Sequence, residues 1–260
     1  MSNFKKTFQL VAVFLFVSVV QLSAQTYKYQ KIVGFSDETN AKLEAFLQST
    51  ISMNIRKVAV FDCDGTLFGQ VPYYLAEEAL YEYARRNYAG KKDAKSVEKF
   101  KLVDKMIHED AISRERDRIK FLSGMTPEEI QRIGDDCFHE KYQNKFYPQM
   151  KALLTNLRNY GFETWVISAS PELLYQRFCV EELGFQEDRV IGVKSLVTMG
   201  GVVTDQIVFP SPQDEGKAEV IRTFIKTRPL FAAGNSRGDM EMMNTYVCLK
   251  LILNPAAKTP

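Results

Sequence analysis

The chain has 260 residues, 45% of them hydrophobic and 25% charged, and its formal net charge is +2. This is the composition of a globular protein, and the length suits one sizeable α/β domain with an insertion or two small domains. The balanced charge gives no indication of a nucleic acid as partner.

The N-terminal segment stands apart from the rest of the chain. Two lysines precede an apolar run over residues 8–22, and small residues follow it up to Ala24. This layout is typical of a secretory signal peptide, and the run is short for a membrane span, which needs about 20 apolar residues. We therefore expect residues 1–24 to be a signal peptide and the protein to be exported, either periplasmic or secreted. It would contact a membrane only if this segment stays uncleaved.

The next part of the chain predicts a helix followed by a buried strand. Apolar residues recur at roughly helical spacing within residues 26–55. The continuous apolar run 58–61 then suits a strand that is buried on both faces, as in a parallel sheet. Three further runs of this kind, and therefore three further predicted strands, lie at residues 164–167, 230–233 and 247–253.

A long segment between the first two strands is charged and helical in character. Residues 70–146 contain no strand-like run and predict three helices, at 76–88, 96–120 and 126–142. The last of these has a strong helix start, because Thr126 can cap it and acids fill its first turn. We expect the segment to form an α-helical cap over one end of the sheet.

The remaining residues predict the core. A helical pattern begins at Pro148 and stops at Gly161, and residues 199–201 between two valine-containing runs are typical of a β-hairpin turn. Because strands and helices alternate, we expect an α/β fold with a doubly wound parallel sheet, a Rossmann-type core made of residues 25–69 and 147–260.

The most informative polar cluster follows the first strand. Asp62 and Asp64 share a face of the strand end, because side chains alternate along a strand. Two carboxylates this close repel, and a divalent cation is the usual way to offset the repulsion. One carboxylate can attack phosphorus, while the other donates a proton to the leaving group and takes one from water. Cys63 between them points the other way and is expected to pack in the core.

Four segments together resemble the motifs of the haloacid dehalogenase superfamily. They are Asp62-Cys63-Asp64-Gly65-Thr66, Ser168, Lys217 and Gly234-Asn235-Ser236-x-x-Asp239, in the order of the family and at plausible spacing. The helical insertion and the residues after Lys217 look like the phosphoserine phosphatase branch. The resemblance implies phosphoryl transfer to water, with Mg²⁺ as cofactor and a small phosphorylated metabolite as substrate.

The resemblance also implies a role for each matching residue. Asp62 would be the nucleophile and a magnesium ligand, and Asp64 would be the general acid and base, with its backbone carbonyl on the metal. Ser168 would hydrogen-bond a phosphoryl oxygen. Lys217 would neutralise the phosphate and Asp62 as charge builds.

The fourth motif departs from the family pattern at its first position. Asn235 stands where the family usually has an aspartate. An amide oxygen can coordinate Mg²⁺, but without the charge that hard cations favour. Asp239 could supply that charge directly or through a water, so the choice between Asn235 and Asp239 as the metal ligand stays open.

The cap gives little information about the substrate. Phosphoserine phosphatases have a glutamate nine positions after the nucleophile, and Val71 at that position here argues against phosphoserine. Tyr73 and Tyr74 are expected to pack in the core or in a flap. A role at the entrance stays open, because aromatic rings suit a quaternary ammonium group and exported relatives in this branch include phosphocholine phosphatases.

Other charged residues of the cap are interpreted as structural. Arg114, Arg116 and Arg118 offer cations, but we expect them on a solvated helix face. His108 and His139 have no metal-ligand spacing, and we assign them no function.

The cysteines give an ambiguous signal. Cys63, Cys137, Cys179 and Cys248 have irregular spacings and form no CxxC motif. An oxidising compartment permits disulfides, so one bridged pair stays open, although the sequence does not decide which. Cys63 and Cys248 lie in apolar, strand-like runs, where we expect free buried thiols.

The sequence thus favours an exported, magnesium-dependent phosphatase that hydrolyses a small phosphomonoester through an aspartyl-phosphate intermediate. Two alternatives stay open. The same chemistry could pass the phosphoryl group to another alcohol, as in a phosphotransferase or mutase. The chain could also be a catalytically weak binding protein with this fold, which only Asn235 supports.

Overall fold

The computed structural model describes residues 27–70 and 73–253. The expected signal peptide and Val71 lie outside these residues. Within the two described ranges, no helix is both long and apolar enough to span a membrane.

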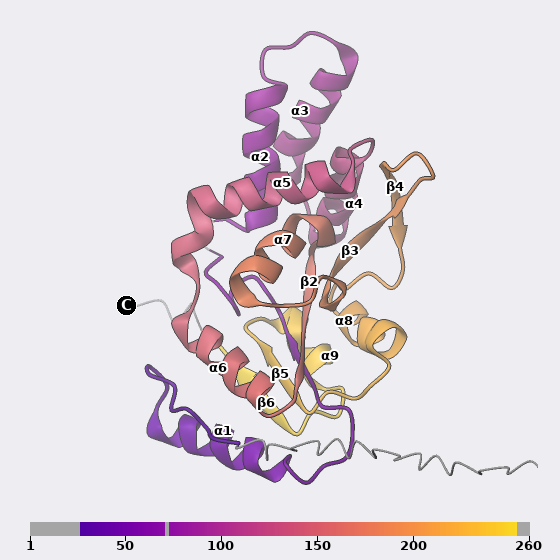
Figure 1. The fold of residues 1–260 in the computed structure, drawn as a ribbon. Helices are drawn as coiled ribbons and strands as arrows, with labels where there is room; N and C mark the ends of the chain where they lie inside the picture. Colours follow the sequence, from indigo (N-terminus) through magenta and orange to yellow (C-terminus); the bar gives the residue numbers. More distant parts are fainter. Residues whose placement is uncertain (1–26, 71–72, 254–260) are drawn as a thin grey trace, which may run out of the picture.

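The core is one six-stranded sheet with the strand order β4-β3-β2-β1-β5-β6 (Figure 1). Neighbouring strands run parallel, except that β3 and β4 are antiparallel. This confirms the predicted α/β fold with a mostly parallel sheet. The strands are β1 (Val58–Phe61), β2 (Glu163–Pro171), β3 (Val190–Val197), β4 (Val203–Val208), β5 (Phe231–Gly234) and β6 (Leu249–Ile252).

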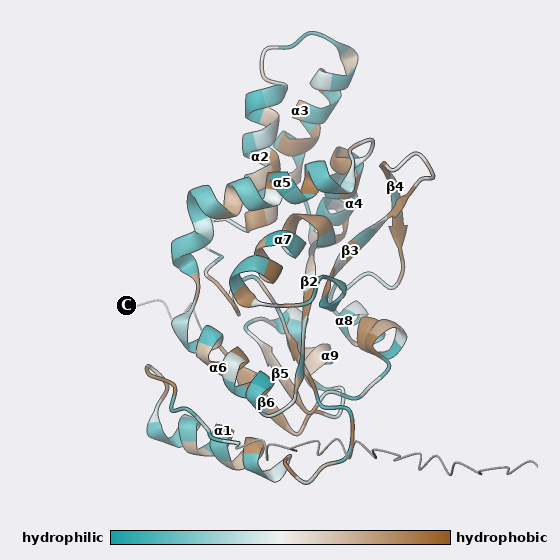
Figure 2. Cartoon of the chain, viewed as in Figure 1, coloured by the Kyte–Doolittle hydropathy of each residue, from teal (hydrophilic) through white to brown (hydrophobic). Residues whose placement is uncertain are grey.

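Strand β1 lies at the centre of the sheet and is buried on both faces. Ala59 and Phe61 pack into one hydrophobic layer with α1, α6 and α7, and Val58 and Val60 pack into a second layer with α8, η4 and α9. Figure 2 shows the strands mainly in hydrophobic colours. The covering helices are α1 (Asp37–Ser49), α6 (Pro148–Asn159), α7 (Glu172–Leu183), α8 (Gly216–Val220), the π-helix η4 (Ile221–Ile225) and α9 (Met240–Met243).

A helical insertion connects β1 to β2, as predicted. In Figure 1, α2 and α3 project farthest from the sheet. Its elements are α2 (Leu75–Asn87), α3 (Ala94–Met106), α4 (Ala111–Leu122), α5 (Pro127–Cys137), the π-helix η1 (Phe138–Tyr142) and the 3₁₀ helix η2 (Gln143–Lys145). Two further 3₁₀ turns outside the insertion are η3 (Glu187–Arg189) and η5 (Arg237–Asp239).

The single helix predicted over 96–120 was wrong, because the structure has two. Helix α3 ends at Met106, and α4 begins after Asp110, whose carboxylate accepts hydrogen bonds from the backbone N–H groups of Ile112 and Ser113. This N-cap fixes Asp110 in an extended conformation and so interrupts the helix. The start predicted at Thr126 is confirmed, with a capping box between Thr126 and Glu129.

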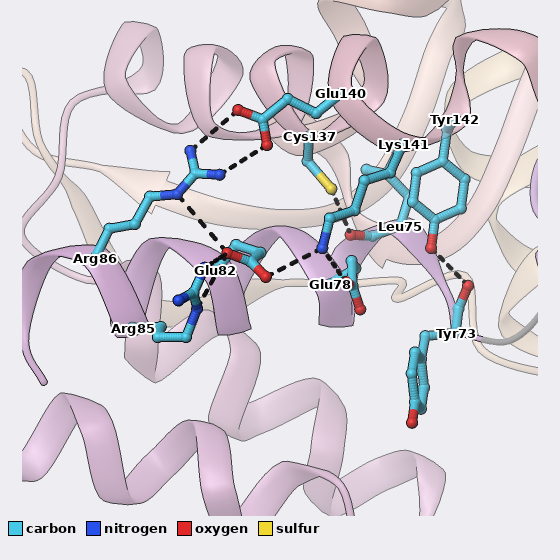
Figure 3. A network of polar contacts seen from close by, with 10 residues as sticks. All are labelled: Tyr73, Leu75, Glu78, Glu82, Arg85, Arg86, Cys137, Glu140, Lys141 and Tyr142. Carbon is cyan, nitrogen blue, oxygen red and sulfur yellow. Dashed lines mark hydrogen bonds and ion pairs between the residues drawn. The ribbon is translucent and has the colours of Figure 1, made fainter.

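The π-helix η1 is fastened to α2 by a polar network (Figure 3). Lys141 pairs with Glu78 and, at 3.1 Å, with Glu82. The hydroxyl of the buried Tyr142 donates to the backbone carbonyl of Tyr73 at 2.8 Å. Exposed ion pairs contribute little individually, so the partly buried hydrogen bond of Tyr142 is the stronger link.

The insertion also contacts the core directly. Helix α5 lies so close to α7 that a Cβ added at Gly134 would be 1.9 Å from the carbonyl oxygen of Leu174. The rings of Phe138 and Phe178 stack with centroids 4.5 Å apart. At the turn after α4, Val203 of β4 exchanges two backbone hydrogen bonds of 2.9 Å with residues 124 and 125. These contacts fix the insertion over the sheet.

The hairpin predicted at residues 199–201 is confirmed between β3 and β4, where Gly201 donates to the carbonyl of Thr198 at 2.9 Å. All four cysteines are free thiols, and the sulfurs of Cys63 and Cys179 lie 4.0 Å apart. Cys63 is buried as expected. Cys248 is exposed, contrary to expectation, because it precedes β6 at the edge of the sheet, where one face of the strand is open.

Candidate active site

A cavity of about 160 Å³ lies at the carboxyl ends of β1, β2 and β5. In an open α/β sheet, this edge is where ligands bind. Five of the six predicted site residues line it, and only Asp239 does not. The lining residues are Asp62, Asp64, Gln70, Tyr74, Ala111, Arg114, Arg118, Ser168, Ala169, Ser170, Gln213, Asp214, Lys217, Asn235, Ser236 and Gly238.

Lys217 bridges two buried carboxylates. Its ammonium nitrogen donates to Asp62 Oδ1 at 2.7 Å and to Asp239 Oδ1 at 2.6 Å. Burial by itself would lower the pKa of Lys217, but the two carboxylates outweigh it and raise that pKa above its usual range. Burial likewise opposes ionisation of Asp239, yet Lys217 holds the pKa of this carboxyl below its ordinary value. Burial raises the pKa of Asp62, and Lys217 acts against this rise. The three side chains therefore form a buried unit in which the lysine stabilises the ionised form of both carboxyl groups.

The turn after β1 orients the second oxygen of Asp62. The hydroxyl of Thr66 donates to Asp62 Oδ2 at 2.9 Å. Gly65 has a φ of +80°, and a Cβ there would lie 2.0 Å from Asn235 Nδ2. Only glycine meets both requirements without strain, so Gly65 allows the loop after β5 to approach the aspartate pair.

Asp64 lies in a different environment. The hydroxyl of Tyr175 lies 3.0 Å from Oδ1 and 2.8 Å from Oδ2 of Asp64, and the Ser170 hydroxyl lies 3.4 Å from Oδ2. Burial and then the negative charge of Asp62 raise the pKa of Asp64 to about 7, against the opposing effects of Tyr175 and Arg118. A carboxyl group with this pKa can both donate and accept a proton near neutrality.

The donor set at the strand ends fits a hard divalent cation. Asp62, Asp64 and Asn235 all line one cavity and carry side-chain oxygen atoms, which are the ligand type that Mg²⁺ prefers. The oxygens of Asp239 are already used: Oδ1 binds Lys217, and Oδ2 accepts from the backbone N–H groups of Asn235 and Ser236 and from the Ser236 hydroxyl. The geometry therefore favours Asn235 over Asp239 as the residue whose side chain faces a cation.

Ser168 lies at the cavity on strand β2 and is buried. Its Oγ accepts a hydrogen bond of 3.2 Å from the backbone N–H of Ser170. This interaction orients the hydroxyl and leaves its own hydrogen available to an anion in the cavity.

The sequence interpretation missed part of the cavity wall. Arg114 and Arg118 were expected on a solvated face, but both line the cavity, and the side chain of Arg118 is only 8% exposed. Arg116 is exposed, as expected. The spacing of Arg114 and Arg118 could have indicated a shared role, since residues four apart lie on one face of a helix. Tyr175 was also missed, because a tyrosine inside an apolar helix pattern gives no functional signal.

The tyrosines before α2 are placed differently from the prediction. Tyr73 and Tyr74 were expected to pack in the core or a flap, but both are exposed, at 54% and 38%. Tyr74 lines the cavity, so the entrance role that the sequence left open fits its position. His108 and His139 are not among the lining residues.

Taken together, these features define an α/β protein that holds a pair of aspartates at a strand end beneath a helical insertion. The sequence model of the haloacid dehalogenase-like hydrolase family matches residues 59–244 of the chain. The chain belongs to this family, as its motifs predict. Hydrolases of this family act in general on small phosphorylated molecules.

Solved structures show the same fold. A functionally unknown protein from Anaerococcus prevotii is 15% identical with a TM-score of 0.64, covering 84% of this chain and 86% of its own. A protein of unknown function from Bordetella pertussis is 17% identical with a TM-score of 0.60, covering 78% and 92%. Cytosolic 5'-nucleotidase IIIB bound to cytidine is 16% identical with a TM-score of 0.52, covering 84% and 77%. No curated protein matches the chain.

Proposed function

We propose that this protein is a magnesium-dependent phosphatase that hydrolyses a small phosphomonoester through an aspartyl-phosphate on Asp62. One observation carries the proposal. Asp62 and Asp64 share a small cavity at the end of β1, with the Lys217 ammonium group 2.7 Å from Asp62 and the Tyr175 hydroxyl on Asp64. The two carboxylates therefore have different partners, as a nucleophile and a proton donor require.

In the first step, an oxygen of Asp62 attacks phosphorus. Burial raises the pKa of Asp62, and the ion pair with Lys217 opposes this shift by favouring the ionised, nucleophilic form. The bond between phosphorus and the ester oxygen breaks, and protonated Asp64 donates its proton to the leaving alkoxide. Lys217 and the hydroxyl of Ser168 stabilise the negative charge of the phosphoryl oxygens.

In the second step, water replaces the enzyme carboxylate. Asp64, now ionised, takes a proton from the water as it attacks phosphorus, and the bond between phosphorus and Asp62 breaks. Inorganic phosphate leaves, and both aspartates return to their starting protonation states. A pKa of about 7 for Asp64 supports both directions of this proton transfer.

Magnesium would be held by Asp62, the backbone carbonyl of Asp64 and Asn235. When bound, it supplies positive charge that offsets the repulsion between the carboxylates and the phosphoryl group. The amide of Asn235 contributes no charge, so we expect weaker metal affinity than an aspartate would give.

The test is release of inorganic phosphate from p-nitrophenyl phosphate and from a panel of small phosphomonoesters that includes phosphocholine and phosphoserine. Each is measured with Mg²⁺ and with EDTA, for the wild type and for Asp62→Asn. Asp205→Asn, at an exposed position of β4, is the matched control. We expect metal-dependent release that Asp62→Asn abolishes and Asp205→Asn leaves unchanged.

Other outcomes separate the alternatives. Loss of substrate without inorganic phosphate, but with a new phosphorylated alcohol, indicates a phosphotransferase or mutase. No turnover together with no Mg²⁺ binding in a calorimetric titration indicates the binding protein instead.

We also propose that the protein is exported, and the pattern of residues 1–24 supports this. Fractionation of expressing bacteria should place the protein outside the cytoplasm, with a mature chain that begins at Gln25. Val13→Arg, which interrupts the apolar run, should leave full-length protein in the cytoplasm. Equal distribution of both forms would contradict export through this segment.

A further inference from the structure

Helix α4 of the insertion forms one wall of the cavity. Ala111, Arg114 and Arg118 line the cavity, and their spacings of three and four residues place them on one face of the helix. Arg116 lies on another face and is exposed. Two guanidinium groups from the insertion therefore share a cavity with Asp62 and Asp64.

The two arginines share one carboxylate partner. Both contact the same oxygen of Glu77 on α2: Arg114 Nη1 at 2.9 Å and Arg118 Nη2 at 3.1 Å. Arg114 also donates to the backbone carbonyl of Glu109 at 2.7 Å. Glu77 is thus shared by two guanidinium groups, and Arg118 also faces the carboxyl groups of Asp64 and Glu115, whose pKa values it lowers.

Each arginine also has an unused donor. The Nε atoms of Arg114 and Arg118 are buried and, among residues 27–70 and 73–253, have no hydrogen-bond partner. Arg118 as a whole residue is only 6% exposed. A buried N–H group without an acceptor is unfavourable, so a small rotation of either side chain that brings an N–H group to the oxygen atoms of a ligand in the cavity would relieve this cost.

We propose that Arg114 and Arg118 form a second anion site, and that the substrate is a small phosphomonoester carrying a carboxylate or a second phosphate. This inference rests on the proposed function. The transferred phosphoryl group has Lys217 and Ser168 as its own partners, whereas the arginine pair lies on the insertion. A guanidinium fork matches the oxygen pairs of carboxylate and phosphate groups.

Arg114 is the cleaner of the two positions to test. The charge of Arg118 lowers the pKa of Asp64, so its removal would also change proton transfer for every substrate. Arg114 is not among the main groups that shift the pKa of Asp64. Arg114→Gln is therefore the test variant, and Arg116→Gln on the same helix is its matched control.

Two of the three substrates form a pair that differs only in the second anion, and the third tests a second phosphate. 3-Phosphoglycerate carries a carboxylate where glycerol 3-phosphate carries a hydroxymethyl group, and ethylene glycol bisphosphate carries a second phosphate. For Arg114→Gln, we expect KM to rise about 10- to 100-fold for the anionic substrates, as for loss of a charge-assisted hydrogen bond. KM for glycerol 3-phosphate should rise much less than KM for the anionic substrates, and Arg116→Gln should behave as wild type. The anionic substrate whose KM rises more in Arg114→Gln carries the preferred anion.

Two results would overturn the inference. One is an equal loss for all substrates, which would place Arg114 on the transferred phosphoryl group. The other is no effect of Arg114→Gln on any of them. If Arg114→Gln does not fold, Arg114→Lys keeps the charge but loses the fork, and should retain part of the preference.

A binding experiment separates this inference from the proposed function. Calorimetry with Asp62→Asn needs no turnover and compares 3-phosphoglycerate with glycerol 3-phosphate. Tighter binding of 3-phosphoglycerate that is lost in Asp62→Asn/Arg114→Gln supports the anion site even if the wild type hydrolyses nothing. Equal binding of the two compounds contradicts the anion site even if p-nitrophenyl phosphate is hydrolysed.

Discussion

The ammonium nitrogen of Lys217 and Oδ1 of Asp62 lie 2.7 Å apart, although 155 residues separate them in the sequence. Both side chains are buried, and Asp239 completes the unit on the other side of the lysine. In such a unit each charge depends mainly on its protein partners, because burial leaves it little contact with water. The contact therefore matters for stability as well as for chemistry.

Lys217→Met should abolish turnover and lower the free energy of unfolding by about 3–5 kcal/mol, because it leaves two buried carboxylates without a cation. The measurement is urea denaturation at pH 7 in EDTA. Lys101→Met, at an exposed position of α3, is the control and should change stability by less than about 0.5 kcal/mol. Adding Asp62→Asn to Lys217→Met should restore part of the loss, and no restoration would contradict the account.

Asp64→Asn should abolish turnover but stabilise the protein at alkaline pH. The folded protein keeps the proton of Asp64 up to a pKa of about 7, whereas the unfolded chain releases it near its ordinary value. Between these two pKa values the folded state binds more protons, so wild-type stability falls as pH rises through this window. Asparagine resembles the protonated acid and does not titrate.

The free energy of unfolding of Asp64→Asn should therefore exceed that of the wild type by a margin that grows from pH 5 to pH 8. At pH 8 this margin should be on the order of 2–4 kcal/mol. Thermal or urea unfolding in EDTA measures it, because a bound cation would favour the ionised form. Asp205→Asn should show no such trend. A difference that stays constant across this range would mean that Asp64 titrates near its ordinary pKa.

Tyr175→Phe should impair Asp64 without touching the nucleophile. The Tyr175 hydroxyl donates to Asp64 and accepts from the backbone N–H of Ala76 at 3.2 Å. Its loss should destabilise the fold by about 1–3 kcal/mol and raise the pKa of Asp64 further. The pH profile of kcat should move to higher pH, whereas Tyr81→Phe, at an exposed position, should leave it unchanged. An unaltered profile in Tyr175→Phe would show that this hydrogen bond does not tune Asp64.

Gly134→Ala tests the close packing of the insertion on the core. The new Cβ would lie 1.9 Å from the backbone carbonyl oxygen of Leu174, which cannot move aside like a flexible side chain. We expect the free energy of unfolding to fall by about 1–3 kcal/mol. Gly200→Ala, whose nearest neighbour is 3.6 Å away in an exposed turn, should be near neutral. Equal melting temperatures for the two variants would mean that α5 and α7 separate easily.

The core strands could be predicted because their signal is local. The run over 58–61 is apolar throughout, and the structure explains why, since its residues enter hydrophobic layers on both faces of the sheet. The helix boundary at Asp110 was missed for the opposite reason. It depends on one side chain capping the next helix, which competes with a helical pattern that continues around it.

The order of the strands was not available from the sequence. It follows from side-chain packing between elements far apart in the chain, which local patterns do not record. The same limit applies to Cys248, whose apolar surroundings suggested burial although its strand lies at an open edge.

The sequence by itself determined the fold class and the family, because the aspartate pair, the serine, the lysine and the last motif each lie at the end of a strand or the start of a helix. Only the tertiary structure decided which groups meet. It turned Asp239 towards Lys217 and Asn235 towards the cavity, gave Asp64 a tyrosine partner, and brought Arg114 and Arg118 to the same cavity. These outcomes depend on contacts between distant segments and on burial, which set the direction and the charge state of each side chain.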